Sequence, residues 1–498
     1  MRLLCASVIF LGGALTACSF APHYSRPPTQ RPPAAYQEAS GWKTAQPADD
    51  HGRGPWWEIY NDAQLNSFES RVTLANQNLK SAFARLQEAR AQTRIARSYL
   101  FPTVTVDPRA TRERQSRNSP TYNTTKPAIY NDFALDADVT YELDVWGRIR
   151  NNVAAARAGE QASAADLATL DLSLHAELAS DYFTLRSEDA QQELLDRTAS
   201  DYAGALELTQ HLYDGGAAAL ADLDQAKAQL QTALTQASDM RLRRAQAEHA
   251  IAVLLGESAS SFHLDPQPLQ LDVAPPAIDL GLPSELLERR PDVAAAERRV
   301  AAANAQIGVA RAAYFPVFDL LGVAGFESTQ TSNWISAPSR LWSIGPSAAL
   351  TVLDGGLHRA QSAQAHAAYD EQVADYRSSV LGAYQDVEDN IAALRQLEKE
   401  SVSEAAAVAA TTGALEQAQY RYKAGIATYL EIVVAENAAL AARLSAADIQ
   451  VRRMIASVQL VKALGGGWRA PGGPPAASAA GLQSLAGPPP APADGTTR

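Results

Sequence analysis

The chain has 498 residues, 46% of them hydrophobic, and a formal net charge of −12 at pH 7. This negative charge argues against a nucleic-acid partner, which would require a basic face. Both cysteines lie within the first 18 residues, so the body of the chain must be stabilised by packing and not by disulfides.

The N-terminus has the pattern of a secretory signal. Arg2 precedes an apolar run over 3–15, which ends in Leu-Thr-Ala-Cys. This predicts a signal peptide over 1–17, because the run is too short for a spanning helix. The ending resembles a bacterial lipobox, which implies acylation of Cys18; an incidental cysteine after an ordinary signal peptide is the alternative. Residues 18–64 are then a lipid-anchored tether, rich in Pro and Ala over 20–55.

The first half of the body begins with a predicted helix over 65–99. It ends before Phe101-Pro102, because the residue before a proline is pushed out of the α region. Alternation over 103–107 predicts a first strand. A second, clearer strand covers 130–146, and its alternate residues are apolar. Such a strand is long enough to span a bilayer when tilted; a half-buried soluble hairpin is the alternative.

The opposite face of this second strand is acidic. If the apolar face meets lipid, the acids face a lumen, and the pore would favour cations. An acidic patch near a barrel mouth without selectivity is the alternative. The acids are Asp132, Asp136, Asp138, Glu142 and Asp144.

A very long helix follows over 151–213, about 95 Å at roughly 1.5 Å per residue. A glycine turn separates it from a helix over 220–255. The linker over 266–283 is rich in proline. The first repeat therefore spans 65–265.

The second half, 284–467, repeats this plan. Ala89 corresponds to Ala303, and Tyr213 to Tyr422, so the offset falls only from 214 to 209 residues. Phe315-Pro316 again ends a helix. Strands are expected over 317–321 and 342–352, a long helix over 357–423 and a last helix over 429–464. The short helices together match the long ones in length, which predicts short helices stacked end to end in one pseudo-symmetric body. A Gly-, Pro- and Ala-rich tail over 468–498 is expected to be disordered.

Enzymatic motifs do not occur in this sequence. It contains no His-Glu-x-x-His, Gly-x-Ser-x-Gly or phosphate-loop pattern, and its eight histidines are scattered. We therefore expect no catalytic residues, metal site or cofactor.

Several segments together resemble the TolC-like outer-membrane factor family, in its lipoprotein branch. They are Leu-Thr-Ala-Cys18, Trp56-Trp57, Tyr141-Glu-Leu-Asp-Val-Trp-Gly147, Gly281-Leu-Pro-Ser-Glu-Leu-Leu-Glu-Arg-Arg-Pro-Asp292, Ala303 to Pro316 and Tyr420-Arg-Tyr-Lys-Ala-Gly425. The resemblance implies a mainly α protein with membrane β-strands, in which a homotrimer shares a long α-helical barrel and a twelve-stranded β-barrel. It also implies an outer-membrane location with an extension into the periplasm. The implied partners are outer-membrane lipid, a periplasmic adaptor (membrane fusion) protein and an inner-membrane transporter, expected to be proton-driven.

Two glycine turns are the predicted periplasmic tip. Gly216 and Gly425 suit the left-handed position that ends a helix. The resemblance implies a constriction here, and the family often has an acid at the position of Val434, so Glu431 or Asp222 is expected to supply it. Helix capping by these acids is the alternative, as is plain packing for the tyrosines. We expect Arg421 and Tyr422 to bond across subunits and hold the tip closed. The tip and gate residues are Tyr213, Gly216, Asp222, Arg421, Tyr422, Gly425, Leu430, Glu431 and Val434.

The expected function is that of a passive exit duct for drugs or other small solutes. Two alternatives stay open at this point. One is an exit duct for protein secretion, and the other is a lipid-anchored periplasmic coiled-coil scaffold without a pore. A scaffold would not need two pairs of amphipathic strands.

Overall fold

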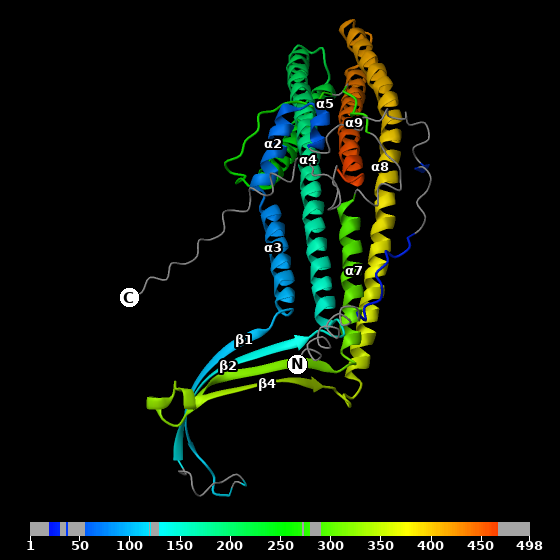
Figure 1. Cartoon of the computed structure of the whole chain (residues 1–498). Coiled ribbons are helices and arrows are strands. Elements are labelled where there is room, and N and C mark those ends of the chain that lie inside the picture. Colours follow the sequence, from blue (N-terminus) through cyan, green and yellow to red (C-terminus); the bar gives the residue numbers. More distant parts are fainter. Residues whose placement is uncertain are drawn as a thin grey trace. The chain divides into compact units, whose positions relative to one another are not determined.

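The computed structural model describes residues 19–29, 36–37, 55–118, 120, 129–270, 273–278 and 290–466. The predicted signal peptide, Cys18 and the predicted tail lie outside these ranges. Within them the chain is mainly helical with four strands (Figure 1). The elements in chain order are η2 (Trp56–Tyr60), α2 (Ala63–Ala75), α3 (Gln77–Ser98), β1 (Thr103–Arg114), β2 (Ile129–Leu143), α4 (Arg148–Asp214), α5 (Leu220–Leu254), α7 (Pro291–Ala312), β3 (Val317–Ser328), η3 (Thr331–Asn333), η4 (Ala337–Ser339), β4 (Arg340–Ala349), α8 (Leu357–Lys423) and α9 (Tyr429–Ala463).

The predicted duplication is visible in the helix lengths. Helices α4 and α8 have 67 residues each, and α5 and α9 have 35 each. A helix of that greater length extends about 100 Å at roughly 1.5 Å per residue. None of the described helices combines the length and apolar character that crossing a membrane requires.

The described residues belong to two compact units. Unit 1 takes its residues from Met1–Thr29, Ala84–Ala164 and Ala295–Ser378, and unit 2 from Gln30–Phe83, Ala165–Ala294 and Ser379–Arg498. Each unit therefore draws on both sequence repeats. The repeats do not fold as two successive domains.

Unit 1 contains one antiparallel sheet in the order β1-β2-β3-β4 (Figure 1). Each repeat supplies one hairpin, and the hairpins join where β2 pairs with β3, with Leu135 opposite Phe326. Both helices that enter the sheet end as predicted before a Phe-Pro pair. The turns are equivalent, because the N–H of Phe101 donates to the carbonyl of Ser98 and that of Phe315 to Ala312.

The first predicted helix, 65–99, is wrong in one respect: it is two helices, α2 and α3. Asn76 between them has an extended backbone, with φ −62° and ψ 126°. Its Oδ1 accepts from the backbone N–H groups of Asn78 and Leu79, at 2.9 and 3.1 Å. An asparagine that caps a new helix in this way replaces the helical bonds lost at the break.

The ends of short helices meet in unit 2, although the predicted helix over 65–99 is divided at the first of these junctions, at Asn76. In the first repeat, Asn76 Nδ2 donates to the carbonyl of Leu254 at the end of α5, at 2.9 Å. Gly256 follows with φ +69°, and a Cβ there would lie 2.6 Å from the carbonyl oxygen of Ala75. In the second repeat, Arg290 Nη1 donates to the carbonyl of Ala463 at the end of α9, at 3.3 Å. Each junction thus satisfies a terminal helix carbonyl with a side chain.

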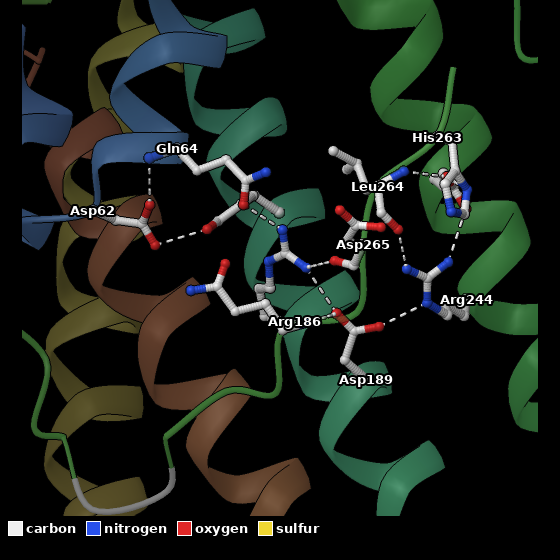
Figure 2. Close-up of polar contacts among 11 residues, drawn as sticks. Asp62, Gln64, Arg186, Asp189, Arg244, His263, Leu264 and Asp265 are labelled. Carbon is white, nitrogen blue, oxygen red and sulfur yellow. Dashed lines mark hydrogen bonds and ion pairs between the residues drawn. The ribbon is translucent and has the colours of Figure 1, made fainter. Parts of the chain in front are cut away.

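A buried polar network in unit 2 joins α4 to α5 (Figure 2). Asp189 accepts from Arg186 Nη1 at 2.8 Å and from Arg244 Nε at 2.7 Å. The same carboxylate accepts from the N–H of Gln267 at 2.8 Å, and Arg186 donates to the carbonyl of Asp265 at 3.0 Å. The end of the first repeat is therefore fixed to α4 by a network whose charges are paired.

Candidate functional site

The sheet has one apolar face. Directly opposed residues of neighbouring strands share a face. One row across the sheet consists of Val104, Val139, Gly322 and Ile344, and the next of Val106, Ala137, Ala324 and Trp342. Val104, Val106, Ile344 and Trp342 are all exposed in the single chain. An exposed apolar face of this extent suits contact with lipid or protein.

The opposite face of the sheet gathers the predicted acids. Asp136 lies opposite Asp107, Asp138 opposite Thr105, and Glu142 opposite Asp319. Asp107 and Asp319, which lie outside the predicted set, belong to this face as well. Extending the two-residue alternation into β1 and β3 could have found both. Asp132 lies 3.8 Å from Arg109 Nη2, so this acid has a basic neighbour.

Asp144 does not belong to this acidic face, and that prediction is wrong. Strand β2 ends at Leu143. The Asp144 carboxylate instead accepts from the backbone N–H groups of Ile149 and Arg150, at 2.9 and 2.8 Å. An acid at the start of a helix satisfies free N–H groups and interacts favourably with the helix dipole. Glu142 stays on the strand, where it accepts from Arg148 Nε at 2.9 Å.

The edges of the sheet are open. Strand β1 pairs only with β2, and β4 only with β3, among the described residues. Each edge therefore presents a row of N–H and C=O groups that another strand could pair. In hydrocarbon such an edge has no water to satisfy it.

The two predicted tip turns lie in unit 2 and have the same geometry. Gly216 and Gly425 have φ of +76° and +71°, which confirms the left-handed prediction. The N–H of Gly216 donates to Tyr213 and that of Ala217 to Leu212; Gly425 and Ile426 donate in the same way to Tyr422 and Arg421. Both turns are therefore Schellman motifs, which satisfy the last carbonyls of α4 and α8.

Asp222 and Glu431 occupy equivalent places after these turns. Asp222 Oδ2 accepts from the N–H of Ala219 at 3.2 Å, and Glu431 Oε1 from the N–H of Thr428 at 3.4 Å. Each acid thus caps the N-terminus of its own helix, Asp222 that of α5 and Glu431 that of α9. Glu431 has a second contact, because Arg421 Nη1 lies 2.9 Å from its Oε2.

The remaining tip residues divide into packed and exposed ones. The Tyr422 ring lies 6.1 Å from that of Tyr429, against a cluster of Ala226, Tyr429 and Val433. Burial raises the pKa of the Tyr422 hydroxyl, and the nearby Asp222 carboxylate adds to this. Tyr213, the equivalent of Tyr422, is instead 37% exposed, and Leu430 and Val434 are exposed as well. Leu430 and Val434 are four residues apart and share a face of α9.

Comparisons with known proteins agree with this geometry. The sequence model of the outer membrane efflux protein family matches residues 70–257 and 282–466. Outer membrane protein OprJ of Pseudomonas aeruginosa is 31% identical over 471 residues, which cover 93% of this chain and 95% of that protein. Toluene efflux pump outer membrane protein TtgF of Pseudomonas putida is 30% identical over 473 residues, 92% of this chain and 96% of that protein. The solved structure of the outer-membrane channel OprN has a TM-score of 0.83 and 31% identity, and the match covers 91% of this chain and all of that chain.

Proposed function

This chain belongs to the outer membrane efflux protein family, and we infer that it is the outer-membrane exit duct of a tripartite efflux system. It conducts solutes passively, because the energy for transport comes from an inner-membrane pump. The observation that carries this inference is the sheet of unit 1, which has one apolar face, one acidic face and two open edges.

The open edges require more than one copy in a membrane. Four strands do not close a barrel, and unpaired edges are not tolerated in hydrocarbon. We propose a homotrimer in which β4 of one copy pairs with β1 of the next, so that three copies build a twelve-stranded barrel. A dimer with eight strands would also close, so the number three depends on the family resemblance.

The rest of the duct is proposed from the same resemblance. Cys18 carries a lipid that anchors the chain in the outer membrane, and the helices extend into the periplasm. A periplasmic adaptor and a proton-driven inner-membrane transporter complete the system. Drugs and other small solutes are the proposed cargo, in keeping with the toluene efflux pump named for one relative.

Two features of the duct are proposed from single residues. Arg421 and Tyr422 bond across subunits and hold the tip closed, in addition to the contact of Arg421 with Glu431 in its own chain. The acids of the barrel strands, Asp136 and Asp138 among them, line the lumen and favour cations.

A cross-linking experiment tests the shared barrel. Thr105 and Ser343 lie on the two edge strands, β1 and β4, and on the same face of the sheet as Asp138, so the proposed pairing of β4 with the next copy's β1 brings their strands together. Cysteines at both positions, treated with a flexible bis-maleimide in intact outer membranes, should give covalent products that end at three chains. The single-cysteine variants are the controls. Products that stop at one or two chains would contradict the trimer, and a purified double variant that forms no pores in planar bilayers despite its cross-links would contradict the duct.

A further inference from the structure

A cavity of about 740 Å³ lies close to the two tip turns, within unit 2. Helices α4, α8 and α9 line it, together with residues of both turns. Much of its wall is apolar, and includes Leu194, Leu208, Leu415, Ile432 and Leu440. Its volume falls within the range of sites that bind small molecules of drug size.

Two polar atoms in the wall of this cavity have no partner. Tyr202 is only 3% exposed, and its hydroxyl is buried without a hydrogen bond to any described residue. Oε2 of Glu436 is likewise buried and without a partner among the described residues. Buried polar atoms are normally satisfied, and an unsatisfied one costs stability unless a ligand or water supplies the bond.

The surroundings of Glu436 make it a poor site for a permanent negative charge. Burial raises the pKa of its carboxyl to about 7, and the Asp201 carboxylate adds to this. Burial also raises the pKa of Tyr202 to about 12, with a further contribution from Glu436. Burial also raises the pKa of Tyr429 on α9, and the Glu436 carboxylate adds to this. Lys423 and Arg443 also line the cavity, and Arg443 Nη2 donates to Thr412 Oγ1 at 3.3 Å.

The internal duplication shows that packing does not require an acid at this position. Ala226 corresponds to Ala435 in the two repeats, so the equivalent of Glu436 is Lys227. Lys227 is exposed and lies 3.9 Å from Asp224. The first repeat builds the same helix with a solvated lysine, whereas the second buries an acid in a cavity.

We propose that this cavity binds an organic amine, with the protonated nitrogen between Glu436 and Tyr202 and the apolar body against the leucines of α4 and α8. A cation supplies the partner that the Glu436 carboxylate lacks, and its N–H groups also reach the phenol oxygen of Tyr202. A metal ion fits these donors less well, because no group of three metal-ligating side chains occurs in the described part of the chain. The site lies within one chain, so it does not depend on the proposed trimer or on conduction.

Calorimetric titration of the full-length protein in detergent micelles tests this site. The probe is 2-(1-naphthyl)ethylamine at pH 8, and the neutral isostere 2-(1-naphthyl)ethanol reports binding without charge. The wild type should bind the amine at least about tenfold more tightly than the alcohol, as expected for a charge-assisted hydrogen bond. Glu436→Gln should abolish this preference while leaving the alcohol unaffected, and Tyr202→Phe should weaken amine binding by a smaller factor.

Lys227→Gln is the matched control, because it also replaces a charged side chain by Gln, at the equivalent position of the other repeat. It should bind the amine like the wild type. Amine affinity should also fall as the pH drops below about 7, since Glu436 then takes up a proton. Equal affinity for amine and alcohol, an unchanged amine affinity in Glu436→Gln, or no saturable binding because the cavity holds only water would each overturn the proposal.

Discussion

Arg421 and Glu431 form an ion pair across the turn between α8 and α9, with Nη1 2.9 Å from Oε2. The other oxygen of Glu431 accepts from the N–H of Thr428 at 3.4 Å. One carboxylate therefore caps the N-terminus of α9 and also pairs with a residue in the last turn of α8. In the proposed closed tip, Arg421 must therefore bond across subunits while it also keeps or exchanges this contact with Glu431.

Replacing Arg421 by Ala together with Tyr422 by Phe should raise the single-channel conductance, because both proposed bonds across subunits are lost. The effect on stability should stay below about 1 kcal/mol, since Arg421 is exposed and surface ion pairs contribute little. Planar-bilayer recordings measure the conductance, and Lys423→Ala, in the same turn, is the control. Unchanged conductance in the double variant would show that these residues do not hold the tip closed.

The acidic face of the sheet should make the pore cation-selective. In a KCl gradient the wild type should give a reversal potential of the sign expected for K⁺ preference. Asp136→Asn combined with Asp138→Asn should move this potential toward zero, whereas Thr140→Ala, on the same face without a charge, should not. Anion preference in the wild type would contradict the proposed orientation of the sheet.

Stability should depend on pH through His175. Its Nδ1 lies 2.5 Å from Glu69 Oε2, and its Nε2 3.5 Å from Asp171 Oδ1. Burial lowers the pKa of His175, but the bonds to Asp171 and Glu69 outweigh this and raise it to about 9. A folded-state pKa above the unfolded value of about 6.5 means that the stabilisation is complete below pH 6.5 and is lost as the pH rises through 9.

The free energy of unfolding of the wild type should therefore fall by an amount on the order of 1–3 kcal/mol between pH 6.5 and 9. The apparent Tm should fall with it. His175→Gln should remove most of this pH dependence, because Gln does not titrate. The exposed His211 lies 3.9 Å from Glu207, and His211→Gln is the control. Parallel pH profiles for wild type and His175→Gln, measured by scanning calorimetry, would rule out the buried pair as the cause.

Two aspartates on α4 should differ strongly in their contribution to stability. Asp189→Ala should cost roughly 3–5 kcal/mol, because Arg186 and Arg244 would be left buried without their shared partner. Asp196 pairs with Arg241 at 2.5 Å on the surface, and Asp196→Ala should cost less than about 1 kcal/mol. Thermal unfolding of the two variants measures the difference, and equal losses would mean that the network of Figure 2 contributes nothing beyond a surface pair.

The sequence alone determined the features that depend on neighbouring residues. A proline at 102 or 316 ends a helix because it restricts the residue before it. Glycines at 216 and 425 end the long helices because they adopt positive φ without a Cβ clash. Alternation of apolar and polar residues follows directly from the two-residue period of a strand. The same local signals occur in the same order in both halves of the chain, and for this reason the repeat is visible in the sequence.

Tertiary structure decided what depends on residues distant in the chain. Asn76 divides a predicted helix because its amide reaches Leu254, 178 positions away. The pairing of β2 with β3 placed Asp319 beside Glu142, and neither strand contains that information by itself. In the sequence, Glu436 looks like an ordinary surface charge of a helix. Its carboxylate oxygen is buried near Tyr202 only because α4 packs against α9. The free-energy cost of burying a charge depends on the groups that surround it. The groups around Glu436 come from distant parts of the chain, so the local sequence does not predict them.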